Sequence, residues 1–232
     1  MIKFTCEKAL LNSAISTVSR AVPSKSTISS LEGILIKAGD QLSLTGYNLE
    51  IGVNTLIPAE VDKIGSLVLP AKLFGDIIRL MPDNIISVSS DDKNIVTIEC
   101  GEIKYNIVGT EADEYPNMPS INEEKTLYIS QKKLSSMIRE TIFAVSESDV
   151  RPIHTGSKFD VQGNEITVVS VDGYRLAIRK EELSINECGD IEFVVPGNAL
   201  KEVEKICSDT DDDAAITVGE KHVMFAMGGT TL

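Results

Sequence analysis

The chain has 232 residues, of which 42% are hydrophobic and 25% are charged, and its formal net charge at pH 7 is −13. That length and apolar content suffice for one large or two ordinary domains with buried cores. The N-terminal residues lack the unbroken apolar run of a secretory signal, and no segment approaches the roughly 20 apolar residues of a membrane helix. We therefore expect a soluble protein without a membrane partner.

Four helices and a set of strands follow from the hydrophobic pattern. Apolar residues recur at intervals of three and four over residues 7–20, 70–81, 131–145 and 196–207, which predicts amphipathic helices there. Residues 32–57 alternate and turn as antiparallel strands do. The pattern thus predicts the same order of elements in each half of the chain, namely a strand, a helix, several strands, a second helix and further strands.

The second half of the chain repeats the first. Residues 4–22 align without a gap with residues 127–145, and their apolar positions coincide. Residues 67–83 align in the same way with residues 193–209. Three similar blocks in one order favour a duplication, and its period of about 125 residues is the size of a domain.

A third, shorter block lies between these two. It places "TGYNLEI", residues 45–51, opposite "DGYRLAI", residues 172–178, with the Gly-Tyr pair and the Leu in step. Gly173 favours a bend that presents Tyr174 and Arg175 outward. The alternative is an ordinary turn that carries a paired Arg.

The predicted fold class is α+β, with two duplicated domains that each pack two helices on antiparallel sheet. We place the first domain at residues 1–123 and the second at 124–232. Residues 109–126, rich in acidic residues and Pro, are interpreted as their connection. On the repeat alignment, the second domain stops before its last strands.

Charge is distributed unevenly over the predicted elements. The helices contain nine cations and five carboxylates, although acidic residues outnumber basic ones in the chain as a whole. The nine cations are Lys8, Arg20, Lys72, Arg79, Lys132, Lys133, Arg139, Lys201 and Lys205. They predict a basic helix layer that attracts phosphate, although an ordinary solvated helix surface has the same composition.

Catalytic and metal-binding patterns are missing from the sequence. The chain has two histidines, His154 and His222, no Gly-rich phosphate loop and no recognised nucleophile turn. The four cysteines are far apart and lack Cys-x-x-Cys spacing, which argues against a metal site and fits buried thiols in a reducing compartment. We expect a cytoplasmic protein that is not an enzyme and has no metal or cofactor.

An acidic segment over residues 209–220 matches four positions of a calcium-binding loop. Asp209, Asp211, Asp213 and Glu220 have the required spacing, but Ala214 stands where that loop needs Gly. The following residues alternate as in a strand, whereas a helix should follow the loop. We interpret the segment as an acidic turn.

With the repeat and these phrases in hand, the sequence resembles the bacterial DNA polymerase III beta subunit family, the sliding clamps. The resemblance runs along the whole chain and is strongest in "VDGYRLAI", "DEYPNMP", "LTGYNLEI" and "VVPGNALKEV". It implies the first two of three domains, with the third absent. In that family two protomers close head to tail into a ring around duplex DNA.

The resemblance also implies partners. These are double-stranded DNA bound without sequence preference, DNA polymerase III and its clamp loader, and other replication or repair proteins that insert a short Gln- and Leu/Phe-containing peptide. The full-length form is expected to be a homodimer that confers processivity within the polymerase holoenzyme. This chain should not close a ring alone.

The resemblance places a partner-peptide pocket on the second domain. Its expected residues are His154, Val171, Gly173, Tyr174, Arg175 and Leu176. His154 stands where the family generally has Leu, and would make the pocket more polar and pH-sensitive. Val171 stands where Thr is common.

For DNA, the resemblance points to Lys25 in the loop "VPSKST". Further expected contacts are Arg20, Arg79, Arg139 and Arg151. For each, a surface cation without a partner is the alternative. A second function remains open, namely a duplicated scaffold that binds protein peptides and never encircles DNA.

Overall fold

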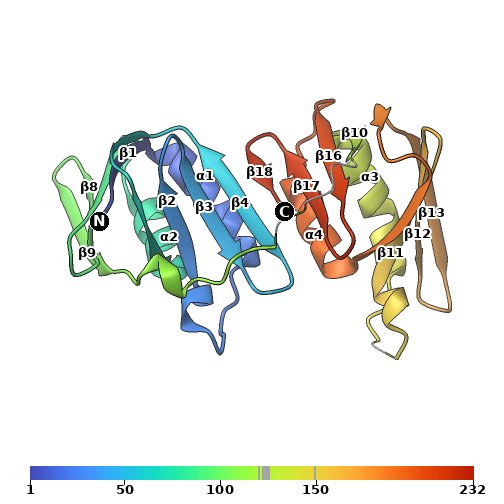
Figure 1. Ribbon diagram of the computed structural model, residues 1–232, viewed down its shortest axis with the longest axis horizontal. Coiled ribbons are helices and arrows are strands. Elements are labelled where there is room, and N and C mark those ends of the chain that lie inside the picture. The colour runs from blue at the N-terminus through green and yellow to red at the C-terminus, as the bar shows by residue number, and fades with distance from the viewer. Residues whose placement is uncertain (120, 122–125, 149) are drawn as a thin grey trace. The chain divides into compact units, whose positions relative to one another are not determined.

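The computed structural model describes residues 1–119, 121, 126–148 and 150–232. The chain divides into two compact units, unit 1 over Met1–Met118 and unit 2 over Pro119–Leu232 (Figure 1). The predicted boundary between residues 123 and 124 lies outside the described residues. The α+β class is confirmed, because each unit combines antiparallel sheets with two helices.

Unit 1 contains two α-helices and nine strands. The helices are α1 (Lys8–Val18) and α2 (Ala71–Leu80), and the 3₁₀ turns are Ser19–Ala21, Ser29–Glu32 and Ala112–Glu114. The strands are β1 (Lys3–Glu7), β2 (Gly33–Ala38), β3 (Leu42–Tyr47), β4 (Gly52–Ile57), β5 (Glu60–Lys63), β6 (Gly65–Pro70), β7 (Ile85–Ser90), β8 (Ile95–Cys100) and β9 (Ile103–Val108). They pair in the orders β5-β1-β7-β8-β9 and β4-β3-β2-β6.

The core of unit 1 forms between its helices and its strands. Helix α1 packs on β3 and β4, α2 packs on β2 and β6, and the two helices touch each other. Their apolar stripes are fully buried, including Leu11 and Val18 of α1 and Phe74 and Ile78 of α2. The helical periodicity in the sequence therefore marks the faces that meet the sheet.

Unit 2 repeats this arrangement. Its helices are α3 (Gln131–Thr141) and α4 (Gly197–Ile206), and its 3₁₀ turns are η4 (Ile142–Ala144) and η5 (Pro152–Thr155). Its strands are β10 (Thr126–Ser130), β11 (Gly156–Gln162), β12 (Glu165–Val171), β13 (Leu176–Glu182), β14 (Ile185–Asn186), β15 (Ile191–Pro196), β16 (Asp213–Val218), β17 (Val223–Met227) and β18 (Thr230–Thr231). They pair in the orders β13-β12-β11-β15 and β14-β10-β16-β17-β18.

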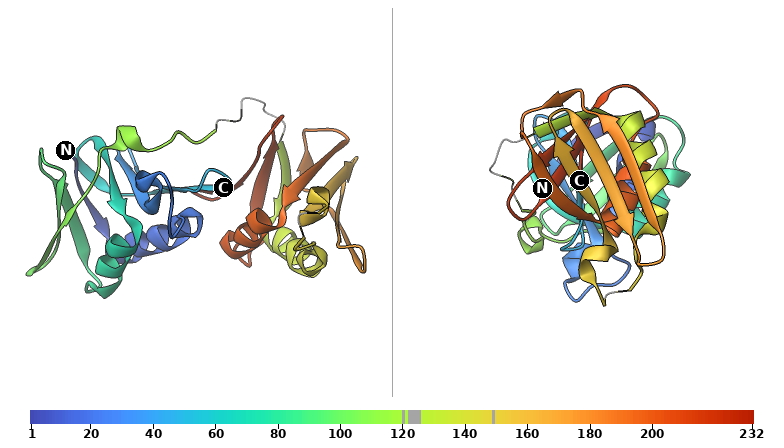
Figure 2. Two further views of the ribbon diagram at one scale, coloured as in Figure 1. Left: turned by 90° about the horizontal axis from the view of Figure 1, so that it is seen from below. Right: turned by 90° about the vertical axis from the view of Figure 1, so that its right-hand side faces the viewer.

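The helices of each unit lie together on one face of its strands (Figure 2, left). Helix α3 packs on β12 and β13, and α4 packs on β11 and β15. The core includes Leu134 and Ile138 of α3, Leu200 of α4 and Phe159 of β11, all fully buried. All four predicted helices are confirmed, and those predicted at 7–20 and 131–145 each end in a 3₁₀ turn.

Both units join the start of the first helix to the loop after the second. In unit 1, the Lys8 N–H donates to the Asn84 carbonyl at 3.1 Å, and Lys8 Nζ lies 2.8 Å from Asp83 Oδ1. In unit 2, the Gln131 N–H donates to the Asp212 carbonyl at 2.8 Å. Because the first N–H groups of a helix have no partner within it, these bonds satisfy them and fix both helices to one loop.

The strand ladders correct the predicted register of the third repeat block. Leu35 pairs with Thr45 and Lys158 with Val169, so residue 45 corresponds to residue 169 and not to 172. The hairpins then place the turn 48–51 on the turn 172–175. The Gly-Tyr pairs of the two blocks are therefore not structurally equivalent, because the predicted alignment is shifted by three residues. Equivalence between strands is decided by their hydrogen-bond register, and not by sequence identity.

Two further sequence predictions concern the acidic segment after α4 and the lack of a membrane helix. Of the acidic turn predicted over residues 209–220, only residues 209–212 form a turn between a helix and a strand, because strand β16 already begins at Asp213 and ends at Val218. The segment does not lead into a second helix, as expected. In the described ranges, no helix is long and apolar enough to cross a membrane.

Candidate functional site

The outer face of sheet β13-β12-β11-β15, the face turned away from α3 and α4, carries apolar residues at one end. Alternation along β12 buries Ile166, Val168 and Ser170 in the core and leaves Val169 and Val171 on the outer face. On β13, Leu176 pairs with Val171 and Ile178 pairs with Val169, and both remain more than half exposed, at 60% and 55%. Exposed aliphatic side chains in adjacent cross-strand pairs form a surface suited to an apolar partner.

The turn between β12 and β13 is built by Asp172 and Gly173. Asp172 Oδ1 accepts the N–H groups of Tyr174 and Arg175 at 3.0 and 3.1 Å, which is an Asx turn. Gly173 has φ +92°, a conformation that residues with a Cβ rarely adopt. The predicted bend at Gly173 is therefore present in the structure.

The turn presents two side chains. Tyr174 is fully exposed, at 100%. Arg175 Nε donates to Asp172 Oδ2 at 2.7 Å, and Arg175 Cζ lies 5.6 Å from the centre of the Phe143 ring. A carboxylate and an aromatic ring together fix the guanidinium, so that its remaining donors are held in place for a ligand.

The hydrogen bonds of the turn also set the charge of Asp172. The Tyr174 N–H, followed by the Arg175 side chain, holds the pKa of the Asp172 carboxyl below its ordinary value. Donors that favour the ionised form have this effect. The ion pair with Arg175 is consequently maintained across the neutral range.

His154 lies at the same end of the sheet. It belongs to η5, which leads directly into β11, and the ladder places the start of β11 beside the end of β12. The His154 carbonyl accepts the Ser146 N–H at 2.9 Å, and its own N–H donates to the Arg151 carbonyl at 2.9 Å. These bonds fix the loop, in which His154 is half-buried and its chain neighbour Ile153 is exposed.

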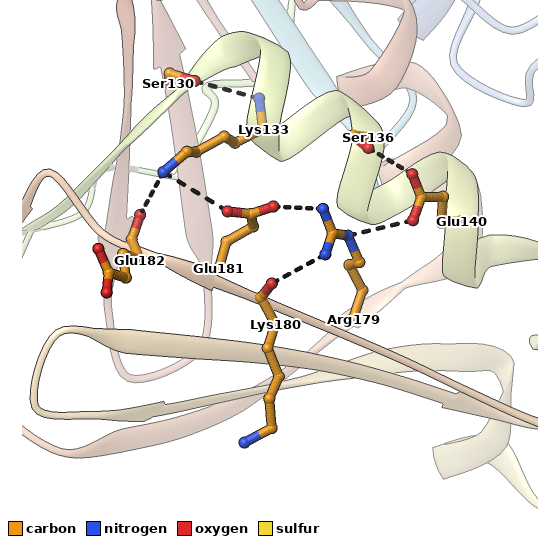
Figure 3. Close-up of polar contacts among 8 residues, drawn as sticks. All are labelled: Ser130, Lys133, Ser136, Glu140, Arg179, Lys180, Glu181 and Glu182. Atoms are coloured by element: carbon orange, nitrogen blue, oxygen red, sulfur yellow. Dashed lines mark hydrogen bonds and ion pairs between the residues drawn. The ribbon is translucent and has the colours of Figure 1, made fainter.

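The base of β13 is tied to α3 by an ion-pair network (Figure 3). Arg179 Nη2 lies 2.5 Å from Glu181 Oε1, and Arg179 Nε lies 3.2 Å from Glu140 Oε2 of α3. Lys133 of α3 contacts Glu181 Oε2 at 3.6 Å and donates to the Glu182 carbonyl at 3.4 Å. This network holds the strand that carries Leu176 and Ile178.

The predicted DNA contacts lie in both units and are all exposed. Arg20 and Lys25 follow α1, and Arg79 in α2 forms an ion pair with Asp76 at 2.8 Å. Arg139 lies in α3, and Arg151 immediately precedes η5. Within the described residues, the side chains of Lys25, Arg139 and Arg151 form no ion pair, so they remain available to an anion.

The predicted pocket residues gather at one corner of unit 2, whereas the DNA residues are distributed over both units. Phe143, which is 55% exposed and whose ring lies beside Arg175, was not predicted from the sequence. A signal was present, because Phe143 is an aromatic residue off the apolar stripe of the predicted helix 131–145. In the part of the chain that the structure describes, no group of three or more His, Cys, Asp or Glu side chains could hold a metal ion.

Comparisons with known proteins match both units. Residues 2–119 match the DNA polymerase III beta subunit, N-terminal domain, and residues 128–232 match its central domain. The chain is 35% identical over 233 residues to the Beta sliding clamp of Bacillus subtilis, covering 97% of this chain and 62% of that protein. It is 33% identical to the Beta sliding clamp of Staphylococcus epidermidis over 98% of this chain and 63% of that protein.

Solved structures agree with these sequence matches. The DNA polymerase sliding clamp of Bacillus subtilis superposes with a TM-score of 0.95 at 34% identity, over 99% of this chain and 63% of that chain. The DNA polymerase III beta chain of Streptococcus pneumoniae gives a TM-score of 0.93 at 27% identity, over 100% of this chain and 63% of that chain. The chain thus spans just over three fifths of the length of these relatives, and it belongs to the DNA polymerase III beta subunit family.

Proposed function

We propose that the chain is the two-unit part of a DNA sliding clamp, which as a complete ring encircles duplex DNA and tethers the replicative polymerase. The observation that carries this proposal is the match of both units, in order, to the N-terminal and central domains of the DNA polymerase III beta subunit. The clamp confers processivity without a catalytic constellation of its own, as part of the polymerase holoenzyme.

The corner of unit 2 docks partner peptides in this proposal. Leu176, Val171 and Ile178 supply an apolar surface for Leu or Phe side chains, and the fixed Arg175 supplies donors for the peptide backbone or a Gln side chain. His154 adds a polar group at one edge. DNA polymerase III, the clamp loader, and replication or repair proteins would use this site through the same short motif.

Duplex DNA is the second proposed partner. Lys25, Arg139 and Arg151 are exposed cations, and Arg20 and Arg79 add charge from the segment after α1 and from α2. Cations that approach phosphates without contacting base edges give binding without sequence preference, which sliding requires. The strongly acidic remainder of the chain would repel phosphate elsewhere.

The edge strand β9 supports the proposed homodimer of the full-length form. It ends the sheet β5-β1-β7-β8-β9, and Ile103, Tyr105 and Val108 on it are exposed. An exposed edge with apolar side chains is suited to pairing with another chain. A reducing location, the cytoplasm, is proposed because all four cysteines are free thiols.

The scaffold alternative, which binds peptides without encircling DNA, rests on one observation. Among the described residues, at least five of the nine predicted helix cations form ion pairs with carboxylates, namely Lys8, Arg79, Lys132, Lys133 and Lys205. Paired cations attract phosphate less strongly than free ones. A test with DNA must therefore accompany the test with peptide.

The first experiment titrates this chain with a Gln- and Leu/Phe-containing peptide while amide NMR shifts are recorded. We expect shifts centred on Gly173, Arg175 and Leu176 that extend to His154. The His154→Leu variant should bind more tightly, because an apolar side chain replaces a polar one in an apolar site. Shifts scattered over both units would contradict the docking site.

The second experiment fuses the third domain of a relative to this chain and measures retention on DNA. A clamp stays on circular duplex DNA and slides off linear DNA, with little dependence on sequence. Arg139→Glu in the same ring should reduce loading on DNA and make the remaining binding less dependent on salt, because fewer phosphates are neutralised. Equal behaviour on circular and linear DNA would favour the scaffold.

A further inference from the structure

The segment that follows β9 does more in unit 1 than connect the units. It crosses the face of the sheet β4-β3-β2-β6 opposite α1 and α2 (Figure 2, left, the light green segment). Thr110 forms a two-way backbone bridge with Val68 of the edge strand β6, with N···O distances of 2.9 and 3.0 Å. A 3₁₀ turn over Ala112–Glu114 follows, where the Glu114 carbonyl accepts the Ser30 hydroxyl at 2.8 Å.

The next residue of this segment, Tyr115, is buried in unit 1. Tyr115 is only 5% exposed and packs in a cluster with Leu31, Leu35, Tyr47 and Val68. Its hydroxyl donates to the Thr45 carbonyl at 3.4 Å, and burial raises the pKa of Tyr115 to about 12.

Met118 also packs against this cluster and takes the space above Gly52. A Cβ at position 52 would lie 2.5 Å from Met118 Cε. The segment Thr110–Met118, here called the strap, is thus seated like a bound peptide, with a backbone bridge and two inserted side chains.

The repeat places the strap over the counterpart of the unit 2 corner. The 3₁₀ turn Ser29–Glu32 corresponds to Pro152–Thr155, so buried Leu31 corresponds to half-buried His154. By the ladders, Tyr47 corresponds to Val171, and Gly52 to the exposed Leu176. The site of unit 1 is filled, whereas the same site of unit 2 remains exposed.

The edge strands complete this correspondence. Leu35 pairs with Val68 in unit 1, and Lys158 pairs with Val194 in unit 2. Val68, which forms the bridge to the strap, is 2% exposed, whereas Val194 is 41% exposed. Both β6 and β15 are edge strands of their sheets and can accept a further backbone.

We propose that unit 1 contains a second peptide-docking groove of the same class as the unit 2 corner, and that the strap occupies it as a built-in ligand. The groove would accept an extended peptide with one aromatic or long apolar side chain. The class of external ligand rests on the proposed function, whereas the groove itself rests only on the contacts of the strap.

Occupancy in the same chain explains why one unit would recruit partners and the other would not. A tethered segment acts at an effective concentration of order millimolar. A weakly binding external peptide cannot displace it at ordinary concentrations. The two units therefore differ in access, although the repeat gives them the same groove.

The test opens the groove by Tyr115→Ala with Met118→Ala and follows amide and methyl NMR shifts. A synthetic peptide with the sequence of residues 109–119 is then added to the variant. We expect the signals of Leu31, Leu35, Tyr47 and Val68 to return toward their wild-type positions. The same peptide with Ala in place of its Tyr, and the wild-type protein with the intact peptide, should show no such change.

The Gln- and Leu/Phe-containing peptide is titrated in parallel. We expect it to shift unit 1 signals only in the variant and unit 2 signals in both proteins. Binding at unit 2 in both but at unit 1 in neither would overturn the second groove and leave the proposed function standing. Binding only at unit 1 of the variant would support the groove and contradict the unit 2 site.

A second variant covers the case in which the double substitution destabilises unit 1. Gly52→Leu removes no apolar side chain from the cluster, but its own side chain takes the space that Met118 occupies above Gly52. It should increase amide exchange over residues 110–118 at least tenfold, while the α1 and α2 amides remain protected. Unchanged exchange in the strap would contradict its role as a displaceable ligand.

Discussion

The turns 48–51 and 172–175 have the same backbone design and opposite surroundings. Asn48 Oδ1 accepts the N–H groups of Glu50 and Ile51, as Asp172 Oδ1 accepts those of Tyr174 and Arg175. Leu49 and Gly173 both have positive φ, at +75° and +92°. The duplication retained the hydrogen-bonded frame of the turn, while charge and side-chain size at its tip diverged.

That difference indicates where binding chemistry can arise. In unit 2 an Asn is replaced by Asp, which adds an ion pair with Arg175, and a Gly is replaced by Leu176, which adds apolar surface. Neither change disturbs the ladder between the two strands. The hydrogen-bonded backbone of the turn belongs to the fold, whereas the side chains at its tip determine what the surface can bind.

The largest effect is expected from removing the apolar surface that unit 2 has and unit 1 lacks. Leu176→Ala should weaken peptide binding roughly 10- to 100-fold, because burying a Leu side chain is worth about 1.5–3 kcal/mol. Isothermal titration calorimetry on the chain measures this loss. Leu56→Ala, at another exposed strand Leu in unit 1, is the matched control and should leave binding unchanged.

A smaller effect is expected from straining the shared frame. Gly173→Ala places a Cβ at φ +92°, which costs about 1–2 kcal/mol. The turn would reorient, and peptide binding should fall about tenfold. Gly163→Ala, at φ +57° in the hairpin between β11 and β12, has a comparable backbone cost and should leave binding intact. Equal loss in both variants would trace the effect to general destabilisation.

The smallest effect is expected from making the unit 2 turn chemically like that of unit 1. Asp172→Asn keeps an acceptor for both N–H groups but removes the ion pair with Arg175. Since this pair is partly exposed, binding should weaken only about two- to fivefold. A loss of affinity as large as that of Leu176→Ala would instead show that the charge, and not the apolar surface, dominates peptide binding.

The Asp172→Asn variant also tests how the stability of the turn depends on pH. The pKa of Asp172 is lowered from 3.8, so its contribution to stability is fully present above that pH and is lost as the pH falls through the lower, folded-state value. Turn amide signals of the wild type should therefore change only below about pH 4. In Asp172→Asn this transition should be missing.

The sequence was sufficient for the helices and for the duplication. Stripes such as Leu11 with Ile15 and Leu134 with Ile138 have a helical period that burial confirms. Gly173 also could be predicted, since a glycine in a strand pattern marks a bend. These features depend on local spacing alone.

The register of the turns and the position of the strap on unit 1 could not be predicted from the sequence. A ladder register depends on hydrogen bonds between strands, so the pairing of Lys158 with Val169 outweighed the shared Gly-Tyr letters. Tyr115 stood in a segment rich in acidic residues and Pro, which has the composition of a connection. Its burial depends on Leu31, Tyr47 and Val68, which are distant in sequence.

The Arg179 network has a mechanical consequence for the docking hairpin. It joins the base of β13 to α3 through Glu140, Glu181 and Lys133, whereas the exposed tip is held by the hydrogen bonds and the ion pair that Asp172 forms within the turn. The hairpin is therefore anchored at two separate points, its base by ion pairs to a helix and its tip by the bonds of Asp172. A partner bound to Leu176 and Ile178 would then pull on a strand that is fastened to α3.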